Sequence, residues 1–231
     1  MHSFSDLGQL SEVLSQQIAA QLGTAIEQQG EALLAVSGGS TPRLLFEKLS
    51  KIELAWHKVR VVLVDERWLD TQSVHSNEHL VRSTLLQNAA QSAHLQGLKS
   101  AAASAKQAQA ACNLALQALP ANIDVLLLGM GDDGHTASWF PCGDQKILGQ
   151  MLDKNNARRA MALQPTSAPH ERMSLTLSYL LTSRHRYLLL KGDNKLTSLR
   201  RAVAGADTMA MPIRAFLGQA NPRLEVFYAT Q

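Results

Sequence analysis

The sequence predicts an α/β protein with a doubly wound, mainly parallel sheet and helices on both faces. Short apolar runs alternate with stretches of helical periodicity along the 231 residues, which is typical of strand–helix–strand units. Several apolar runs end in glycine-rich or charged segments, as strands of an open parallel sheet do beside a ligand. The length suits one large domain, and no repeat or linker divides the chain. We therefore expect a single α/β domain over residues 1–231.

The first part of the chain alternates helix and strand. Apolar positions recur every three or four residues between Ser5 and Gln29, which predicts an amphipathic helix. A short apolar run at 32–36 predicts a strand, and helical spacing resumes over 44–49. The segment 59–64 is rich in β-branched residues, which favours a second strand.

The same alternation continues to the end of the chain. We expect helices over 76–86, 101–119, 191–203 and 212–217, and strands over 124–128, 160–163, 172–177, 187–190 and 224–228. Two prolines predict an extended loop at Pro165–His170. All the strands are expected to join one sheet.

A glycine-rich turn, Ser37-Gly38-Gly39-Ser40-Thr41-Pro42, follows the first predicted strand. Pro42 suits the first turn of a helix, and Ser40 or Thr41 suits the cap before it. Unpaired N–H groups and hydroxyls would then gather at the positive end of a helix dipole, where an anion binds. The turn lacks the spaced glycines of a dinucleotide site and the Gly-Lys-Ser/Thr ending of a nucleotide P-loop. A sugar phosphate fits best, and a strand-to-helix connection without a ligand is the alternative.

Two further loops carry charged and polar residues where predicted strands end. Asp65-Glu66-Arg67-Trp68 follows the strand at 59–64, and Gly129–Ser138 follows the run at 124–128. The second loop has glycines that allow close approach of a ligand, with Asp133 and His135, which suit proton transfer. Carboxyl ends of parallel strands share one edge, so we expect the loops to converge on one cleft. Each loop has an alternative interpretation without a ligand. In that case the charges at 65–68 would only be solvated, and Asp133 and His135 would only cap a helix.

Composition excludes several classes of function. No apolar run approaches the roughly 18 residues that a membrane helix needs, and residues 1–6 lack the pattern of an export signal. We therefore expect a cytoplasmic protein. The net charge is only +3, and its Lys and Arg residues are scattered, so we expect no nucleic-acid partner. No obligate protein partner is evident.

Cysteine and histidine spacing predicts neither a metal site nor a disulfide. The two cysteines, Cys112 and Cys142, are expected to be free thiols. No His or Cys grouping has the spacing of zinc ligands. We therefore expect catalysis without a metal or other cofactor.

Several blocks together resemble the family of 6-phosphogluconolactonases and glucosamine-6-phosphate deaminases. The blocks are Ser37–Pro42, Asp65–Trp68, Ser76-Asn77, Gly129–Pro141 and Pro212–Ala215, in the family's order and spacing. The resemblance implies the Rossmann-like fold of the deaminase relatives. It also implies hydrolysis of 6-phospho-D-glucono-1,5-lactone to 6-phospho-D-gluconate, the second step of the oxidative pentose phosphate pathway.

The residues after His135 separate the two activities of that family. Deaminases carry Asn-Glu-Pro there, whereas this chain reads Trp139-Phe140-Pro141, with no acid. This difference favours the lactonase. Two positions depart from the usual lactonase pattern: His75 stands where an acid is frequent, and Trp139 where a leucine is common. A sugar-phosphate sensor without catalysis is a further alternative, but the length leaves little room for the DNA-binding module that such a sensor usually carries.

The resemblance and the residue types together assign roles in the cleft. A neutral imidazole at His135 would act as general base on water, Asp133 would orient it, and Arg67 would hold the developing oxyanion or a ligand hydroxyl. Asp65 would line the sugar site. The phosphate would bind to Ser37, Gly38, Gly39, Ser40 and Thr41, with charge from Arg172 and Lys195. Which of Arg67, Arg172 and Lys195 meets the phosphate stays open. No covalent nucleophile is required, and Ser138 lacks the elbow motif that would make it one.

Overall fold

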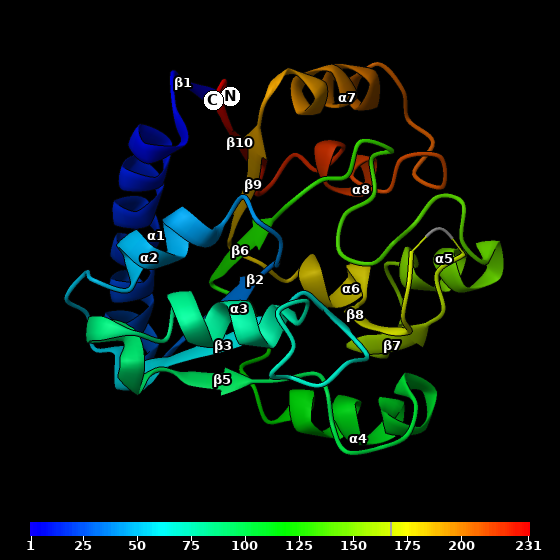
Figure 1. The fold of residues 1–231 in the computed structure, drawn as a ribbon, viewed down its shortest axis with the longest axis horizontal. Helices are drawn as coiled ribbons and strands as arrows, with labels where there is room; N and C mark the ends of the chain where they lie inside the picture. The colour runs from blue at the N-terminus through cyan, green and yellow to red at the C-terminus, as the bar shows by residue number, and fades with distance from the viewer. Residues whose placement is uncertain (167) are drawn as a thin grey trace.

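The computed structural model describes residues 1–166 and 168–231 and contains two sheets (Figure 1). The larger sheet has seven strands in the order β1-β10-β9-β6-β2-β3-β5, all paired in parallel. These strands are β1 (His2–Phe4), β2 (Ala32–Val36), β3 (Val59–Leu63), β5 (His94–Gln96), β6 (Val125–Leu128), β9 (His185–Lys191) and β10 (Leu224–Ala229). The expected doubly wound α/β architecture is confirmed.

Helices cover both sides of this sheet, with α1 and α2 on one side and α6 and α8 on the other (Figure 1). The helices are α1 (Leu7–Gln29), α2 (Arg43–Leu49), α3 (Asn77–Thr84), α4 (Ala105–Gln117), α5 (Gln145–Met151), α6 (Leu177–Leu180), α7 (Asp193–Val203) and α8 (Arg214–Leu217). Asp6 caps α1 by accepting the N–H of Gln9, and the helix ends at Gly30 in the left-handed conformation. The apolar stripe of α1, including Leu14 and Ile18, is buried against the sheet.

The strand order places a switch point between the two central strands. From β2 the chain moves outward through β3 to β5, whereas β6, β9 and β10 follow one another on the other side. Loops that leave the carboxyl ends of β2 and β6 therefore turn in opposite directions and part above the sheet. Open α/β sheets bind ligands in the crevice formed at such a point.

A second, antiparallel sheet corrects the expectation of a single sheet. It consists of β4 (Asp65–Arg67), β8 (Arg172–Leu175) and β7 (Ala160–Leu163), in the order β4-β8-β7. Val64 joins the two sheets, because its N–H bonds to Val36 O in the first and its carbonyl accepts the N–H of Leu175 in the second. The segment 65–68, predicted as a loop, is thus largely a strand.

The short edge strands were not predicted from the sequence. β1 pairs with β10, and Leu7 N donates to Gln231 O at 2.8 Å, so the two ends of the chain lie side by side (Figure 1). β5 extends the opposite edge beside β3. Of the predicted loop at 165–170, Ser167 lies outside the described residues.

Candidate active site

The carboxyl ends of β2, β6 and β9 border a cavity of about 320 Å³. All three predicted loops reach it. Of the predicted site residues, those that line the cavity are Ser37, Gly38, Gly39, Ser40, Thr41, Asp65, Arg67, His135 and Lys195. Asp133 stands directly behind His135, whereas Arg172 does not line the cavity.

The glycine-rich turn presents free donors to the cavity. Ser37 N bonds to Leu127 O, but the backbone N–H groups from Gly38 to Thr41 donate no hydrogen bond to the described part of the chain. The Ser37 hydroxyl is buried and has no hydrogen-bond partner among those residues. Buried polar groups are normally paired, so an unpaired cluster facing a cavity suits an anionic or hydroxylated ligand.

The predicted cap of the next helix is wrong. α2 begins at Arg43 after Pro42, and no side chain caps it. The Ser40 and Thr41 hydroxyls instead remain unbonded within the described residues, beside the cavity. Gly39 has φ of 101°, which an L side chain rarely adopts, and this conformation carries the turn back toward α2.

His135 and Asp133 form a close pair. Asp133 Oδ1 lies 2.6 Å from His135 Nδ1 and also accepts the His135 N–H at 3.0 Å. Burial raises the pKa of Asp133, but the hydrogen bonds and charge of His135 outweigh this effect and lower that pKa to about 2. An ionised carboxylate only accepts, so Nδ1 carries the ring proton and the Nε2 lone pair is left as the base.

Glycine at position 131 makes room for this pair. The Gly131 N–H donates to His135 O at 2.8 Å and closes the turn. A methyl group on Gly131 would lie 2.2 Å from the His135 ring and 2.7 Å from Asp133 Oδ1. Phe140 packs against the imidazole, with ring centroids 4.6 Å apart. The ring is therefore in contact with both the turn and an aromatic side chain.

Asp65 and Arg67 approach the cavity from β4. Asp65 Oδ2 accepts the Ser138 hydroxyl at 2.6 Å. Ser138 is fully buried and does not line the main cavity, which agrees with its lack of a nucleophile motif. The Arg67 guanidinium donates to His75 O, so a backbone carbonyl orients it at the cavity wall.

Asn77 and Lys191 line the cavity although the sequence analysis gives neither of them a role there. Asn77, the first residue of α3, lines the cavity and donates from Nδ2 to Asp65 O at 2.7 Å. The Ser76-Asn77 block was noted without a role for the amide. Lys191 also lines the cavity, at the end of β9. The sequence predicts Lys191 as the start of a helix, whereas the structure has it as the last residue of β9.

Lys195 and Arg172 differ in their placement. Lys195 lines the cavity, and its Nζ lies 2.8 Å from Asp132 Oδ1. Arg172 is buried in β8 opposite Arg67, and its Nη2 donates to Pro169 O. Burial is the main cause that lowers the Arg172 pKa. The structure therefore brings Lys195, but not Arg172, to the cavity wall.

Within residues 1–166 and 168–231, no three His, Cys, Asp or Glu side chains lie together as metal ligands. None of the helices there is long and apolar enough to cross a bilayer. Cys112 is buried and Cys142 exposed, and both are free thiols.

Fold and site together define a class of protein: an α/β protein with a donor-rich cavity and a His–Asp pair at the switch point of a parallel sheet. The family described as glucosamine-6-phosphate isomerases/6-phosphogluconolactonase matches residues 5–224. The chain belongs to this family.

Individual relatives agree with that assignment. The chain is 40% identical over 229 residues to a 6-phosphogluconolactonase of Rhizobium meliloti, covering 99% of this chain and 98% of the relative. It is 42% identical to one of Pseudomonas putida, covering 94% and 88%. The crystal structure of a 6-phosphogluconolactonase from Shewanella baltica superimposes with a TM-score of 0.95 at 42% identity, covering 99% of this chain and 96% of that one.

Proposed function

We propose that this protein is an enzyme that hydrolyses 6-phospho-D-glucono-1,5-lactone to 6-phospho-D-gluconate. The observation that carries the proposal is that the His135–Asp133 pair and the unpaired N–H groups from Gly38 to Thr41 face one cavity. One end of that cavity suits a phosphate, and the other can activate water. The relatives at about 40% identity bear the name of this activity.

In the proposed mechanism, His135 is the general base. Its Nε2 takes a proton from water as the water oxygen attacks C1 of the lactone. The Arg67 guanidinium stabilises the oxyanion of the tetrahedral intermediate. Collapse of the intermediate breaks the bond between C1 and the ring oxygen, and the imidazolium returns its proton to that oxygen. Asp133 holds the ring in the reactive tautomer throughout.

The phosphate is placed on the turn from Ser37 to Thr41, with Lys195 as its cation. Backbone donors and one ammonium group give charge-assisted hydrogen bonds without a metal. To reach the phosphate, Lys195 exchanges the exposed carboxylate of Asp132 for the ligand. Arg172, buried behind Arg67, contributes positive potential rather than a direct contact.

Deamination of an amino sugar phosphate is the second candidate, because the family includes both activities. Phe140 argues against it, since its ring packs on the imidazole where the deaminase pattern supplies a carboxylate. The proposed reaction needs only water and the sugar-phosphate lactone, with no cofactor and neither nucleic acid nor membrane. We place it in the cytoplasm.

The test is a direct hydrolysis assay. The lactone is generated from glucose 6-phosphate with its dehydrogenase, and its disappearance is followed with and without the protein. We expect clear acceleration by the wild type and a fall of about 100-fold in kcat for His135→Ala. Disappearance at the spontaneous rate would reject the lactonase, and full activity of His135→Ala would reject the proposed base.

A further inference from the structure

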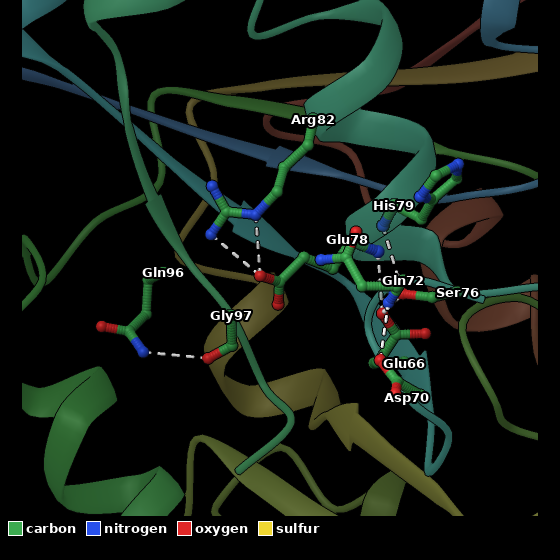
Figure 2. A network of polar contacts seen from close by, with 9 residues as sticks. All are labelled: Glu66, Asp70, Gln72, Ser76, Glu78, His79, Arg82, Gln96 and Gly97. Carbon is green, nitrogen blue, oxygen red and sulfur yellow. Dashed lines mark hydrogen bonds and ion pairs between the residues drawn. The ribbon is translucent and has the colours of Figure 1, made fainter. Parts of the chain in front are cut away.

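A fully buried carboxylate, Glu66, ties β4 to the start of α3 without any ion pair among the described residues (Figure 2). Glu66 Oε1 accepts the N–H groups of Arg67 at 2.7 Å and Asn77 at 2.9 Å. Glu66 Oε2 accepts the Ser76 hydroxyl at 2.8 Å and the Glu78 N–H at 2.7 Å. Two of the four donors therefore belong to residues that line the cavity.

The donor set shows which form of Glu66 the fold uses. Burial is the largest effect on the Glu66 carboxyl and leaves its pKa above the ordinary value, although the four hydrogen bonds act to lower that pKa. Three of the four partners are backbone N–H groups, which can only donate, and an ionised carboxylate, which can only accept, matches this set. The ionised form also suits the N-terminus of α3, where the helix dipole favours negative charge. Glu66 thus fixes the position of Asn77 relative to Arg67.

The Asn77 side chain has a defined orientation. It is only 3% exposed, and its Nδ2 lies 2.7 Å from Asp65 O and 3.4 Å from Asp65 Oδ1. Both neighbours are acceptors, which sets the amide nitrogen on that side. The amide oxygen therefore points the other way, toward Gly38, where an added methyl group would lie 1.9 Å from it.

This amide oxygen is an acceptor with nothing bound to it. No donor in the described part of the chain hydrogen-bonds to Asn77 Oδ1, and Asn77 lines the cavity with Gly38 and Asp65. An amide oxygen repels a phosphate but accepts from a hydroxyl. The cavity thus has acceptor oxygens at Asn77 and Asp65 beside the donors of the glycine-rich turn.

We propose that Asn77 is a substrate-binding residue whose Oδ1 accepts a hydrogen bond from a sugar hydroxyl, and that Glu66 is the positioning residue that holds it there. The inference rests on the proposed function and adds a specificity residue to it. It explains why a carboxylate is buried beside the site although it does not line the cavity. It also explains why position 38 must be glycine.

The test separates affinity from folding. Calorimetric titration with the product, 6-phosphogluconate, gives both Kd and the fraction of competent molecules. Inorganic phosphate serves as a probe without sugar hydroxyls, and its affinity is measured by competition with 6-phosphogluconate. We expect Asn77→Ala to raise Kd for 6-phosphogluconate about tenfold, as loss of one hydrogen bond does, and to leave phosphate affinity unchanged.

Glu66→Gln keeps the side-chain volume and replaces one acceptor oxygen by a donor. We expect the same selective rise in Kd, with near-unit stoichiometry. The matched control is Glu78→Gln, whose side chain faces Arg82 and Gly97 instead of the cavity (Figure 2). Its Kd should equal that of the wild type.

Each other outcome has a defined meaning. Unchanged Kd in Asn77→Ala, or equal weakening of phosphate and 6-phosphogluconate, would overturn the role of Asn77. A Glu66→Gln protein with lower stoichiometry but wild-type Kd would show that Glu66 serves folding alone. If the wild type neither hydrolysed the lactone nor bound its product, the proposed function itself would fail.

Discussion

Asp133 Oδ1 contacts both the backbone N–H and the ring Nδ1 of His135, at 3.0 and 2.6 Å. One oxygen therefore fixes the position of the residue and the rotation of its ring. The imidazole meets the cavity already oriented, and its tautomer is set by a carboxylate two residues earlier. Such preorganisation lowers the cost of reaching the reactive geometry.

Asp133→Asn should lower kcat for the lactone about 100-fold and change KM little. The neutral amide no longer stabilises the imidazolium, and its nitrogen can favour the wrong tautomer. Steady-state kinetics with the coupled dehydrogenase assay measures both constants. A variant that keeps wild-type kcat would exclude Asp133 from the catalytic pair.

Stability should depend on Asp133 in a defined pH window. The folded pKa of about 2 lies below the ordinary aspartate value of 3.8, so the stabilisation is present above pH 3.8 and is lost as pH falls toward 2. Because the side chain is 42% exposed, solvent screening limits the effect to about 1 kcal/mol. Urea midpoints of wild type and Asp133→Asn should differ at pH 6 and converge near pH 2. A constant difference across this range would contradict the assignment.

Gly131→Ala should disrupt the site. The new methyl group would lie 2.2 Å from the His135 ring, so the ring must move, and we expect kcat to fall at least tenfold with about 1–3 kcal/mol of lost stability. Gly149→Ala is the matched control, because nothing lies within 4 Å of a methyl group there. That control should keep full activity and gain slightly in stability. Equal activities of the two variants would refute the steric argument.

Lys195→Ala should raise KM for the phosphorylated lactone about tenfold, because one charge-assisted contact to the phosphate is lost. Hydrolysis of the unphosphorylated glucono-δ-lactone should hardly change. Lys106→Ala, on α4 and outside the cavity lining, controls for the loss of one positive charge. If both substrates were affected equally, the lysine would act on the reacting centre instead of the phosphate.

Ser138→Ala should retain kcat within a few-fold. The hydroxyl is fully buried and donates to Asp65 Oδ2, so its loss leaves a carboxylate oxygen unpaired and should cost about 1–3 kcal/mol of stability. Thermal unfolding and steady-state rates measure the two effects. Complete loss of activity in a folded variant would reopen the possibility of a covalent intermediate.

The sequence predicted the central strands because each is an apolar run buried on both faces. It did not predict β1 and β5, whose three residues are too short to show periodicity. It also placed β7 and β8 in the main sheet, because alternation reveals a strand but not its partner. The two sheets diverge at Val64, whose backbone N–H bonds to one sheet and whose carbonyl bonds to the other.

The sequence predicted those site residues that directly follow the carboxyl ends of parallel strands. The segments that begin at Ser37, Asp65 and Gly129 follow β2, β3 and β6, and they converge because parallel strands share a carboxyl edge. A position in a strand does not reveal which neighbours cover a side chain, so the sequence did not show that Arg172 is buried and outside the cavity lining. The role of Asn77 depends on Gly38, 39 residues earlier, and no local pattern encodes such a contact.

The pairing of β1 with β10 joins residues about 225 positions apart, such as His2 with Phe227. β1 lies at the edge of the sheet and pairs with β10 alone over three residues, so few interactions hold it in place. The pairing of β1 with β10 should therefore be the last part of the sheet to assemble and the first to open. Because the ends are adjacent, a short peptide could join them and new ends could be cut in an exposed loop, giving a circular permutant with the cavity intact.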